Sequence, residues 1–134
     1  MNTFKLKIVT PDGLQFDGLA EELIVRTTTG DLGIMAGHIN CVAPLGMGRA
    51  MVITEGQKRY AACIGGMVSV VGGEVTLVPT TFEWADKIDV ERADASYQRA
   101  QKILKDKAST ETDVKLAESR LKRALVRKSV ASVK

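Results

Sequence analysis

The last 55 residues of the chain contain neither glycine nor proline, whereas all twelve glycines and all three prolines lie at or before Pro79. Glycine and proline form turns and interrupt helices, so their distribution divides the chain into two kinds of structure. Residues 1–84 are rich in turns, and we expect a domain of short strands there. Residues 85–134 contain nothing that would break a helix, and we expect a helical domain.

Histidine, cysteine and long apolar runs are also scarce. The single histidine, His38, excludes a metal site built from several histidines. Cys41 and Cys63 form no CxxC pair, and we expect two reduced, buried thiols. No stretch reaches the roughly 20 apolar residues of a membrane span, and Lys5 and Lys7 interrupt the first apolar run, so we expect no signal peptide. Without a nucleophile–base arrangement or a phosphate-cradling glycine loop, an enzyme is not expected.

Charge divides at the same boundary as glycine and proline. Residues 1–85 hold six Lys/Arg and eight Asp/Glu, a net charge of −2, and residues 86–134 hold thirteen and eight, a net charge of +5. The tail is therefore the better contact for an acidic partner or a phosphorylated ligand. A nucleic-acid-binding module is the alternative class. Against it, Tyr97 is the only aromatic residue of the tail, so no stacking platform is present.

The first domain alternates in the manner of strands with one buried face. Phe4, Leu6 and Ile8 alternate with lysines, and Glu22–Thr27 follows as a further strand. Two hairpins with tight glycine turns are expected, Arg49–Thr54 with Lys58–Ile64, and Met67–Val71 with Glu74–Val78. Short strands at this spacing predict an antiparallel β-sandwich or a small barrel.

Three segments of this domain are apolar on both faces, which predicts a second cover beyond the sandwich core. These segments are Ala50–Ile53, Ala61–Ile64 and Met67–Val71. Either the helical tail or another protein must supply that cover.

The tail predicts two helices joined by a short polar loop, which form an antiparallel hairpin. The first stripe of apolar residues is Val90, Ala93, Tyr97, Ala100 and Leu104, and the second is Val114, Ala117, Leu121 and Leu125. Asp86 or Asp89 can cap the first helix, and Thr110 with Asp113 resembles a capping box for the second. Alanine-rich seams bury little area, so the hairpin should be only marginally stable alone and able to detach.

A basic row follows on the second helix, where Arg120, Arg123 and Arg127 share one face, roughly opposite the apolar stripe. One interpretation is a solvated helix face. The other is a docking strip for carboxylates or phosphates, whose oxygens match the guanidinium fork.

With these residues in view, the chain resembles the ε subunit of bacterial F-type ATP synthases over nearly its whole length. Three segments carry the resemblance: LKIVTPDGLQFDG near the start, GDLGIMAGH at Gly30–His38, and IDVERA at Ile88–Ala93. The third matches the I/L-D-x-x-R-A pattern associated with ATP binding in some ε subunits. The resemblance implies a sandwich of about ten strands over residues 1–84 and a helical hairpin over residues 85–134.

The resemblance also implies a function without catalysis. The sandwich would contact the γ subunit and the c-ring on the cytoplasmic face of the cell membrane, with no nucleic-acid partner and no membrane insertion. The hairpin would either fold onto the sandwich or extend into the α/β catalytic ring, where its basic face, Arg120, Arg123 and Arg127, would inhibit ATP hydrolysis. ATP, a regulatory ligand and not a required cofactor, would favour the folded form.

Carried over residue by residue, the implied ATP site comprises Glu83, Ile88, Asp89, Arg92, Ala93, Arg99, Arg123 and Arg127. Asp89 would accept a hydrogen bond from the adenine amino group, and Ala93 would leave room for the ring. The family pattern places the arginines of the second helix about one residue earlier, where this chain has Lys122 and Val126. Which basic residues of that helix contact ATP therefore stays open.

The loop that by resemblance faces the c-ring and γ contains Asp31 and His38. The family usually has proline before Gly37 and again after His38. Here Ala36 and Ile39 stand at those places, so we expect a less rigid loop.

Overall fold

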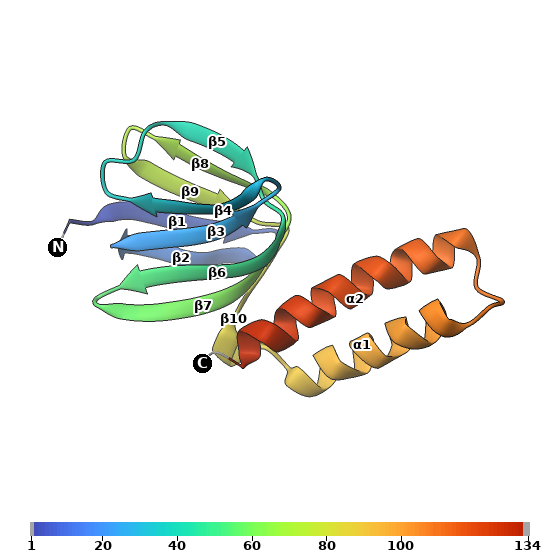
Figure 1. Ribbon diagram of the computed structural model, residues 1–134. Coiled ribbons are helices and arrows are strands. Elements are labelled where there is room, and N and C mark those ends of the chain that lie inside the picture. The colour runs from blue at the N-terminus through green and yellow to red at the C-terminus, as the bar shows by residue number, and fades with distance from the viewer. Residues whose placement is uncertain (1, 133–134) are drawn as a thin grey trace.

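Ten strands in two sheets and a helical hairpin make up the computed structural model, which describes residues 2–132 (Figure 1). The strands are β1 (Phe4–Thr10), β2 (Gly13–Ala20), β3 (Glu22–Thr27), β4 (Gly30–Met35), β5 (Cys41–Pro44), β6 (Met47–Thr54), β7 (Gln57–Ile64), β8 (Met67–Val71), β9 (Glu74–Val78) and β10 (Thr81–Trp84). A short 3-10 helix, η1 (Ala85–Lys87), leads to α1 (Val90–Lys105) and α2 (Glu111–Ala131). The predicted sandwich and hairpin are confirmed.

The two sheets each contain five strands, in the orders β2-β1-β9-β8-β5 and β10-β7-β6-β3-β4. All pairs are antiparallel except β1 with β9, which run parallel. Strand β1 shows why the sheets stack: Phe4, Leu6 and Ile8 are buried and the lysines between them are exposed. Each sheet thus has an apolar face that must be covered.

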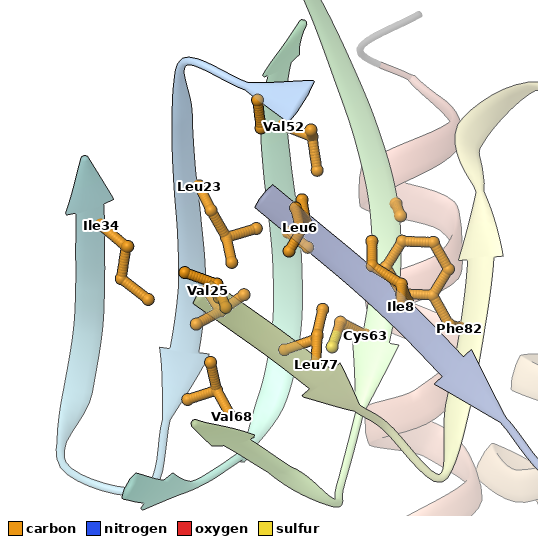
Figure 2. Close-up of a cluster of buried hydrophobic side chains, with 14 of the residues drawn as sticks. Leu6, Ile8, Leu23, Val25, Ile34, Val52, Cys63, Val68, Leu77 and Phe82 are labelled. Carbon is orange, nitrogen blue, oxygen red and sulfur yellow. The ribbon is translucent and has the colours of Figure 1, made fainter. Parts of the chain in front are cut away.

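The main core fills the space between the two sheets (Figure 2). Leu6, Leu23, Val52 and Leu77 come from four different strands and are fully enclosed. Cys63 also points into this core, and burial raises the pKa of its thiol to about 12. Both cysteines are free thiols, but Cys41 is only half-buried, because it lies on the short edge strand β5.

The two expected hairpin turns have the backbone conformation that their residues favour. Glu55 and Gly56 between β6 and β7, and Gly72 and Gly73 between β8 and β9, all have positive φ, as a tight type I′ turn requires. Gly66 has a stricter role, since a Cβ there would lie 2.0 Å from the carbonyl oxygen of Val78. That spacing admits no side chain.

A smaller cluster attaches the hairpin to the outer face of the second sheet. Ala62 on β7 packs with Ala85 and Ile88 of the junction and with Val130 and Ala131 of α2, and we call these five residues the docking cluster. The hairpin contacts the sandwich where α1 begins and α2 ends, while the loop between the two helices projects away from the sandwich (Figure 1). The tail therefore covers the second apolar face of Ala61–Ile64, which confirms for this segment the prediction that the tail supplies the cover.

The same cover does not extend to Met67–Val71. Pro44, Met67 and Val78 form a row across β5, β8 and β9, and Met67 and Val78 are each 48% exposed. Val42 and Val71 on neighbouring positions are 61% exposed. This outer apolar face of the first sheet is open in the isolated chain. Of the helices that the described residues form, none is long and apolar enough to cross a membrane.

Candidate functional site

Helix α1 begins where the sequence predicts. Asp89 is the N-cap, and its Oδ1 accepts a hydrogen bond from the backbone N–H of Arg92 at 3.0 Å. Helix α2 begins with the predicted capping box, in which Thr110 and Asp113 exchange bonds of 3.1 and 3.2 Å between side chain and backbone. These caps fix the ends of both helices, and the first cap holds Asp89 at the junction with the sandwich.

The seam between the helices differs in part from the predicted stripe. Ala93 and Ala100 of α1 are buried, and on α2 the buried residues include Ala117 and Ala124. Leu125, predicted in the stripe, is 46% exposed. Ala124, and not Leu125, lies in the seam because alanines on both helices allow the two backbones to approach closely, whereas a leucine would hold the backbones apart.

A cavity of about 550 Å³ opens between the sandwich, the start of α1 and the end of α2, and we call it the junction pocket. Six of the predicted ATP-site residues line it. They are Glu83, Asp89, Arg92, Ala93, Arg99 and Arg127. Ligand pockets commonly have volumes in the range of about 300–1,000 Å³, so the size suits a small organic ligand.

Two ion pairs hold the end of α2 beside this pocket. Arg127 Nε donates to Glu83 Oε1 at 2.6 Å, and both side chains are about two-thirds buried, with exposures of 28% and 33%. Lys128 Nζ donates to Asp94 Oδ1 at 2.9 Å and lies 4.5 Å from the centre of the Tyr97 ring. The first pair joins α2 to β10, and the second joins α2 to α1.

The remaining predicted residues lie elsewhere. Ile88 is buried in the docking cluster, where it can support the pocket but does not line it. Arg120 and Arg123 line a second cavity of about 410 Å³ between the helices, which we call the hairpin pocket. The three arginines of α2 thus lie beside the seam and not roughly opposite the buried stripe. Val126, one of the two positions of the family pattern, packs against the docking cluster instead.

Sequence reasoning missed several residues of the junction pocket. Lys87 comes from η1, Ser96 from α1, and Thr80 and Thr81 precede or begin β10. Asp12 arrives from the β1–β2 turn, far from the others in sequence. The Thr10–Gly13 turn chemistry is visible in the sequence, but nothing there indicates that the turn would lie beside residues 80–99.

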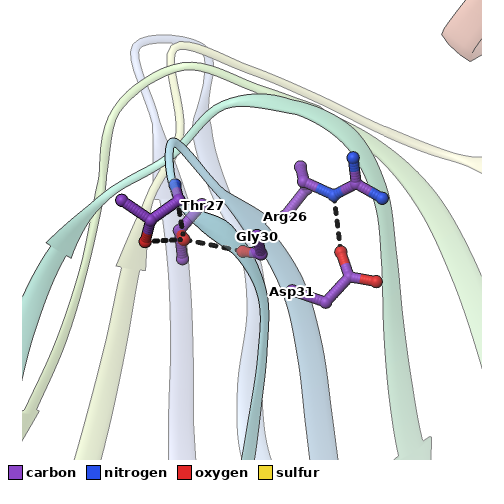
Figure 3. A network of polar contacts seen from close by, with 5 residues as sticks. Arg26, Thr27, Gly30 and Asp31 are labelled. Atoms are coloured by element: carbon purple, nitrogen blue, oxygen red, sulfur yellow. Dashed lines mark hydrogen bonds and ion pairs between the residues drawn. The ribbon is translucent and has the colours of Figure 1, made fainter.

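The second predicted region, Asp31 and His38, belongs to strand β4 of the second sheet and to the segment that follows it. Asp31 Oδ1 accepts a hydrogen bond from Arg26 Nε at 2.6 Å across the β3–β4 pair (Figure 3). Thr27 Oγ1 donates to the Gly30 carbonyl at 2.6 Å and closes the adjoining turn. His38 is exposed, with Nδ1 2.8 Å from the Ile39 carbonyl oxygen, and Ile39 is itself 78% exposed. Asp31 and His38 therefore do not lie in one loop, as the sequence predicted, because strand β4 separates Asp31 at its start from His38 in the exposed segment that follows its end.

Comparison with known proteins assigns both halves of the chain to one class. A family model described as the β-sandwich domain of the ATP synthase delta/epsilon chain matches residues 3–85, and one described as the long α-helix domain of that chain matches residues 86–132. Fold and site therefore define a two-domain subunit of ATP synthase. The chain belongs to the ATP synthase delta/epsilon family, and it is similar over its whole length to bacterial proteins named ATP synthase epsilon chain.

Two such relatives cover nearly the whole chain. The ATP synthase epsilon chain of Bacillus velezensis is 44% identical over 98% of this chain and 98% of its own length. That of Ruminococcus albus is 43% identical over 100% of both. The resemblance found in the sequence is confirmed.

Solved structures share the fold. A chain of the Euglena gracilis mitochondrial ATP synthase, in a structure of OSCP, F1 and c-ring, superimposes with a TM-score of 0.83 at 21% identity, covering 98% of this chain and 82% of that chain. A chain of the Tetrahymena thermophila central stalk and c-ring gives 0.60 at 15% identity, covering 95% of each. At these identities the likeness concerns the fold.

Proposed function

We propose that this chain is a non-catalytic subunit of the central stalk of a bacterial ATP synthase, and that it both couples the rotor and restrains ATP hydrolysis. The observation that carries the regulatory part is the junction pocket, which is built jointly by the sandwich, α1 and α2. A ligand bound there touches every part that would separate if the hairpin left the sandwich. Its binding therefore favours the folded hairpin.

ATP is the ligand that we propose for the junction pocket. Arg92, Arg99 and Arg127 supply guanidinium groups for phosphate oxygens, where paired, charge-assisted hydrogen bonds are strong. Asp89 uses one carboxylate oxygen as the helix cap, and its second oxygen can accept the adenine amino group. Ala93 adds no bulk to the wall beside it. The purine would thus lie near the start of α1.

The partners follow from the exposed apolar surfaces. The row of Pro44, Met67 and Val78 is the kind of face that another protein covers, because large exposed apolar patches are uncommon on monomers. We assign this face to the γ subunit, and the loop around His38 and Ile39 to the c-ring. In a bacterial cell these contacts would hold the chain at the cytoplasmic face of the membrane, outside the bilayer.

The extended hairpin would restrain hydrolysis by reaching the α/β ring. Its basic row, Arg120, Arg123 and Arg127, would then face carboxylates of that ring instead of the two pockets. Because ATP holds Arg127 and Arg99 in the folded form, a high ATP concentration would keep the hairpin away from the ring. The bias equals the difference between the ATP affinities of the two positions.

Calorimetric titration of the isolated chain with ATP tests the ligand. Arg92→Ala and Asp89→Ser should each weaken binding by about 1–3 kcal/mol, since each removes a charged hydrogen-bonding group. Serine keeps the helix cap at position 89, so loss of helix structure would not explain the result. Lys122→Ala removes an exposed charge of α2 outside both pockets and should leave ATP binding unchanged. No binding at millimolar ATP would refute the ligand and leave the stalk assignment standing.

A truncated chain tests the restraint on hydrolysis. The chain should end after Ala85, because Trp84 is 8% exposed and packs edge-to-face against Phe82 within the main core. Assembled into the complete ATP synthase, this variant should support normal assembly and raise the rate of ATP hydrolysis. An unchanged hydrolysis rate in an intact complex would show that the hairpin does not inhibit.

A further inference from the structure

A groove of about 400 Å³ lies between α2 and the outer face of the second sheet, and we call it the sheet groove. Its sheet side contains Ile24 of β3 and Met51 of β6, and its helix side contains Leu125 and Val126 of α2. It shares no residue with the junction pocket, which Arg127 lines from the same helix. The proposed nucleotide site therefore leaves this groove unused.

The apolar lining of the sheet groove is partly open to solvent. Leu125 is 46% exposed. Ile24, Met51 and Val126 are each half-buried. The volume of the groove lies within the range of about 300–1,000 Å³ that is common for ligand sites. An alkyl chain bound there would cover apolar surface of the sheet and of α2 together, and each methylene group removed from water would strengthen the binding.

The charged side chains of the sheet groove leave one positive charge without a partner. Arg26 is neutralised by Asp31, whose Oδ1 lies 2.6 Å from Arg26 Nε (Figure 3). Arg49 lies over the ring of Tyr60, 4.9 Å from its centre, and forms an ion pair with no carboxylate of residues 2–132. A guanidinium group can bind one carboxylate through two parallel hydrogen bonds. The groove is therefore complementary to a single negative charge.

The backbone brings these arginines together at Gly48, which also lines the groove. A Cβ at Gly48 would lie only 2.6 Å from the Cβ of Arg26, so a side chain there would force β3 and β6 apart. Positive φ does not explain this glycine, because Gly48 is not among the glycines of residues 2–132 that have it. The glycine instead permits the close approach that holds Arg26 beside the groove.

We propose that the sheet groove binds the anion of a free fatty acid, with its carboxylate at Arg49 and its alkyl chain between Met51 and Leu125. Such a carboxylate is ionised at neutral pH and carries the one charge that the groove can neutralise. A phosphate monoester would bring a second negative charge close to Asp31, and it is the poorer match. The proposal does not depend on ATP binding in the junction pocket.

A fatty acid in this groove would act on the position of the hairpin. It contacts the sheet and α2 at once, so it binds the docked hairpin and loses half of its contacts when the hairpin detaches. Binding to one of two states stabilises that state by mass action. Because the groove and the junction pocket share no residue, a fatty acid and a nucleotide would favour the same docked hairpin without competing.

Calorimetry of the isolated full chain tests the ligand class, with sodium octanoate and sodium decanoate below their micelle-forming concentrations. One molecule should bind per chain, and each added methylene should tighten binding about two- to fourfold, according to how fully it is buried. Decyltrimethylammonium has the same alkyl chain with the opposite charge, and it should bind at least about fivefold more weakly than decanoate. Equal affinities for octanoate and decanoate, or for the two decyl compounds, would overturn the proposal.

Two pairs of matched variants locate the site. Leu125→Ala should weaken decanoate binding about fivefold, whereas Leu116→Ala, at a leucine of α2 that is 50% exposed and outside the groove, should change it less than about twofold. Arg49→Gln should also weaken binding about fivefold. Its control is Arg59→Gln, which removes an exposed arginine that lies 3.8 Å from the centre of the Trp84 ring, outside the groove. If a control variant weakens binding as much as its counterpart, decanoate binds elsewhere and the proposal fails.

Hydrogen exchange measures the effect on the hairpin. With decanoate at ten times its Kd, the α1 and α2 amides that exchange through detachment should exchange about tenfold more slowly, and Leu125→Ala should remove this protection at the same decanoate concentration. Unchanged exchange in the wild-type chain with decanoate bound would overturn the proposal.

Competition and sedimentation exclude other occupants. Displacement of decanoate by saturating ATP would show that decanoate binds in the junction pocket, and would overturn the proposal. Decanoate binding that depends on Arg49 in a chain that binds no ATP would support the groove and refute the nucleotide proposal alone. A dimer that Leu125→Ala dissociates and decanoate leaves intact would show that a second copy of the chain covers the groove, which also overturns the proposal.

Discussion

The attachment of the hairpin to the sandwich can be weakened at one side chain, Val130. This residue is fully buried, and its neighbours in the docking cluster include Ala62, Ala85 and Ile88. Val130→Ala removes two methyl groups, which at about 0.8 kcal/mol each costs about 1.6 kcal/mol, and the cavity left behind adds to this loss. Alanine returns up to about 0.7 kcal/mol through its higher helix propensity. The net loss is about 1.5 kcal/mol.

That loss should appear as a change in the population of detached hairpins. A free-energy difference of about 1.4 kcal/mol is tenfold in an equilibrium constant, so the detached fraction should rise about tenfold. Hydrogen exchange followed by mass spectrometry measures this directly. Peptides from α1 and α2 should exchange about tenfold faster, whereas peptides from β1, β3 and β6 should be unchanged, because the main core does not include Val130.

Val52→Ala is the matched control, since it makes the same substitution at a fully buried site of the main core. It should accelerate exchange in the strands, which Val130→Ala should not do. If Val130→Ala accelerates the strands and the helices equally, the hairpin and the sandwich unfold together. The argument for a detachable hairpin would then be refuted.

Three further outcomes are expected. In a double-mutant cycle followed by urea unfolding of the hairpin, Glu83→Gln and Arg127→Gln should show a coupling energy of about 1 kcal/mol, because the ion pair is partly buried. Additive effects of the two substitutions would mean that the 2.6 Å contact contributes nothing to stability. Gly66→Ala should destabilise the sandwich by more than about 3 kcal/mol in thermal unfolding, because the φ of +93° at this position and the adjacent carbonyl both oppose a Cβ. The control Gly33→Ala should lower the stability only slightly, because no atom lies within 4 Å of the added Cβ. In the folded chain the pKa of the Cys63 thiol, about 12, lies above its ordinary value of 9.0. The contribution of this thiol to stability is therefore complete below pH 9 and is lost as the pH rises towards 12, so the free energy of unfolding should fall over that interval. A free energy of unfolding that stays constant from pH 9 to 12 in a Cys41→Ser background would contradict the burial argument.

Local sequence signals predicted the elements whose chemistry is local. The two glycine hairpins, the N-cap at Asp89 and the capping box at Thr110 and Asp113 depend on residues a few positions apart, and all are present. Strands β2, β4, β5 and β10 were not assigned from residue patterns. Strands β2 and β4 contain glycines that weaken the alternating pattern, and β5 and β10 have only four residues each.

The features that could not be predicted from the sequence depend on packing between segments that are distant along the chain. Helix α2 has two buried faces, one with Ala117 and Ala124 against α1 and one with Val130 against the sandwich. A single apolar stripe cannot describe both faces, and for this reason the predicted stripe contains Leu125 where the seam contains Ala124. In the same way, Asp12 joins the junction pocket because the β1–β2 turn lies beside it, a proximity that arises only in the folded chain.

The short connection between the two domains also sets a mechanical limit. Only η1, Ile88 and Asp89 separate β10 from α1, and Trp84 anchors the near end of this connection in the main core. Any swing of the hairpin must therefore turn about a point at the edge of the second sheet. The 16 residues of α1 span about 24 Å and the 21 residues of α2 about 32 Å. In the folded form the tail reaches no farther than its longer helix. With the loop at residues 106–110 straightened, the two helices alone would span about 56 Å, and the five loop residues would add to that length.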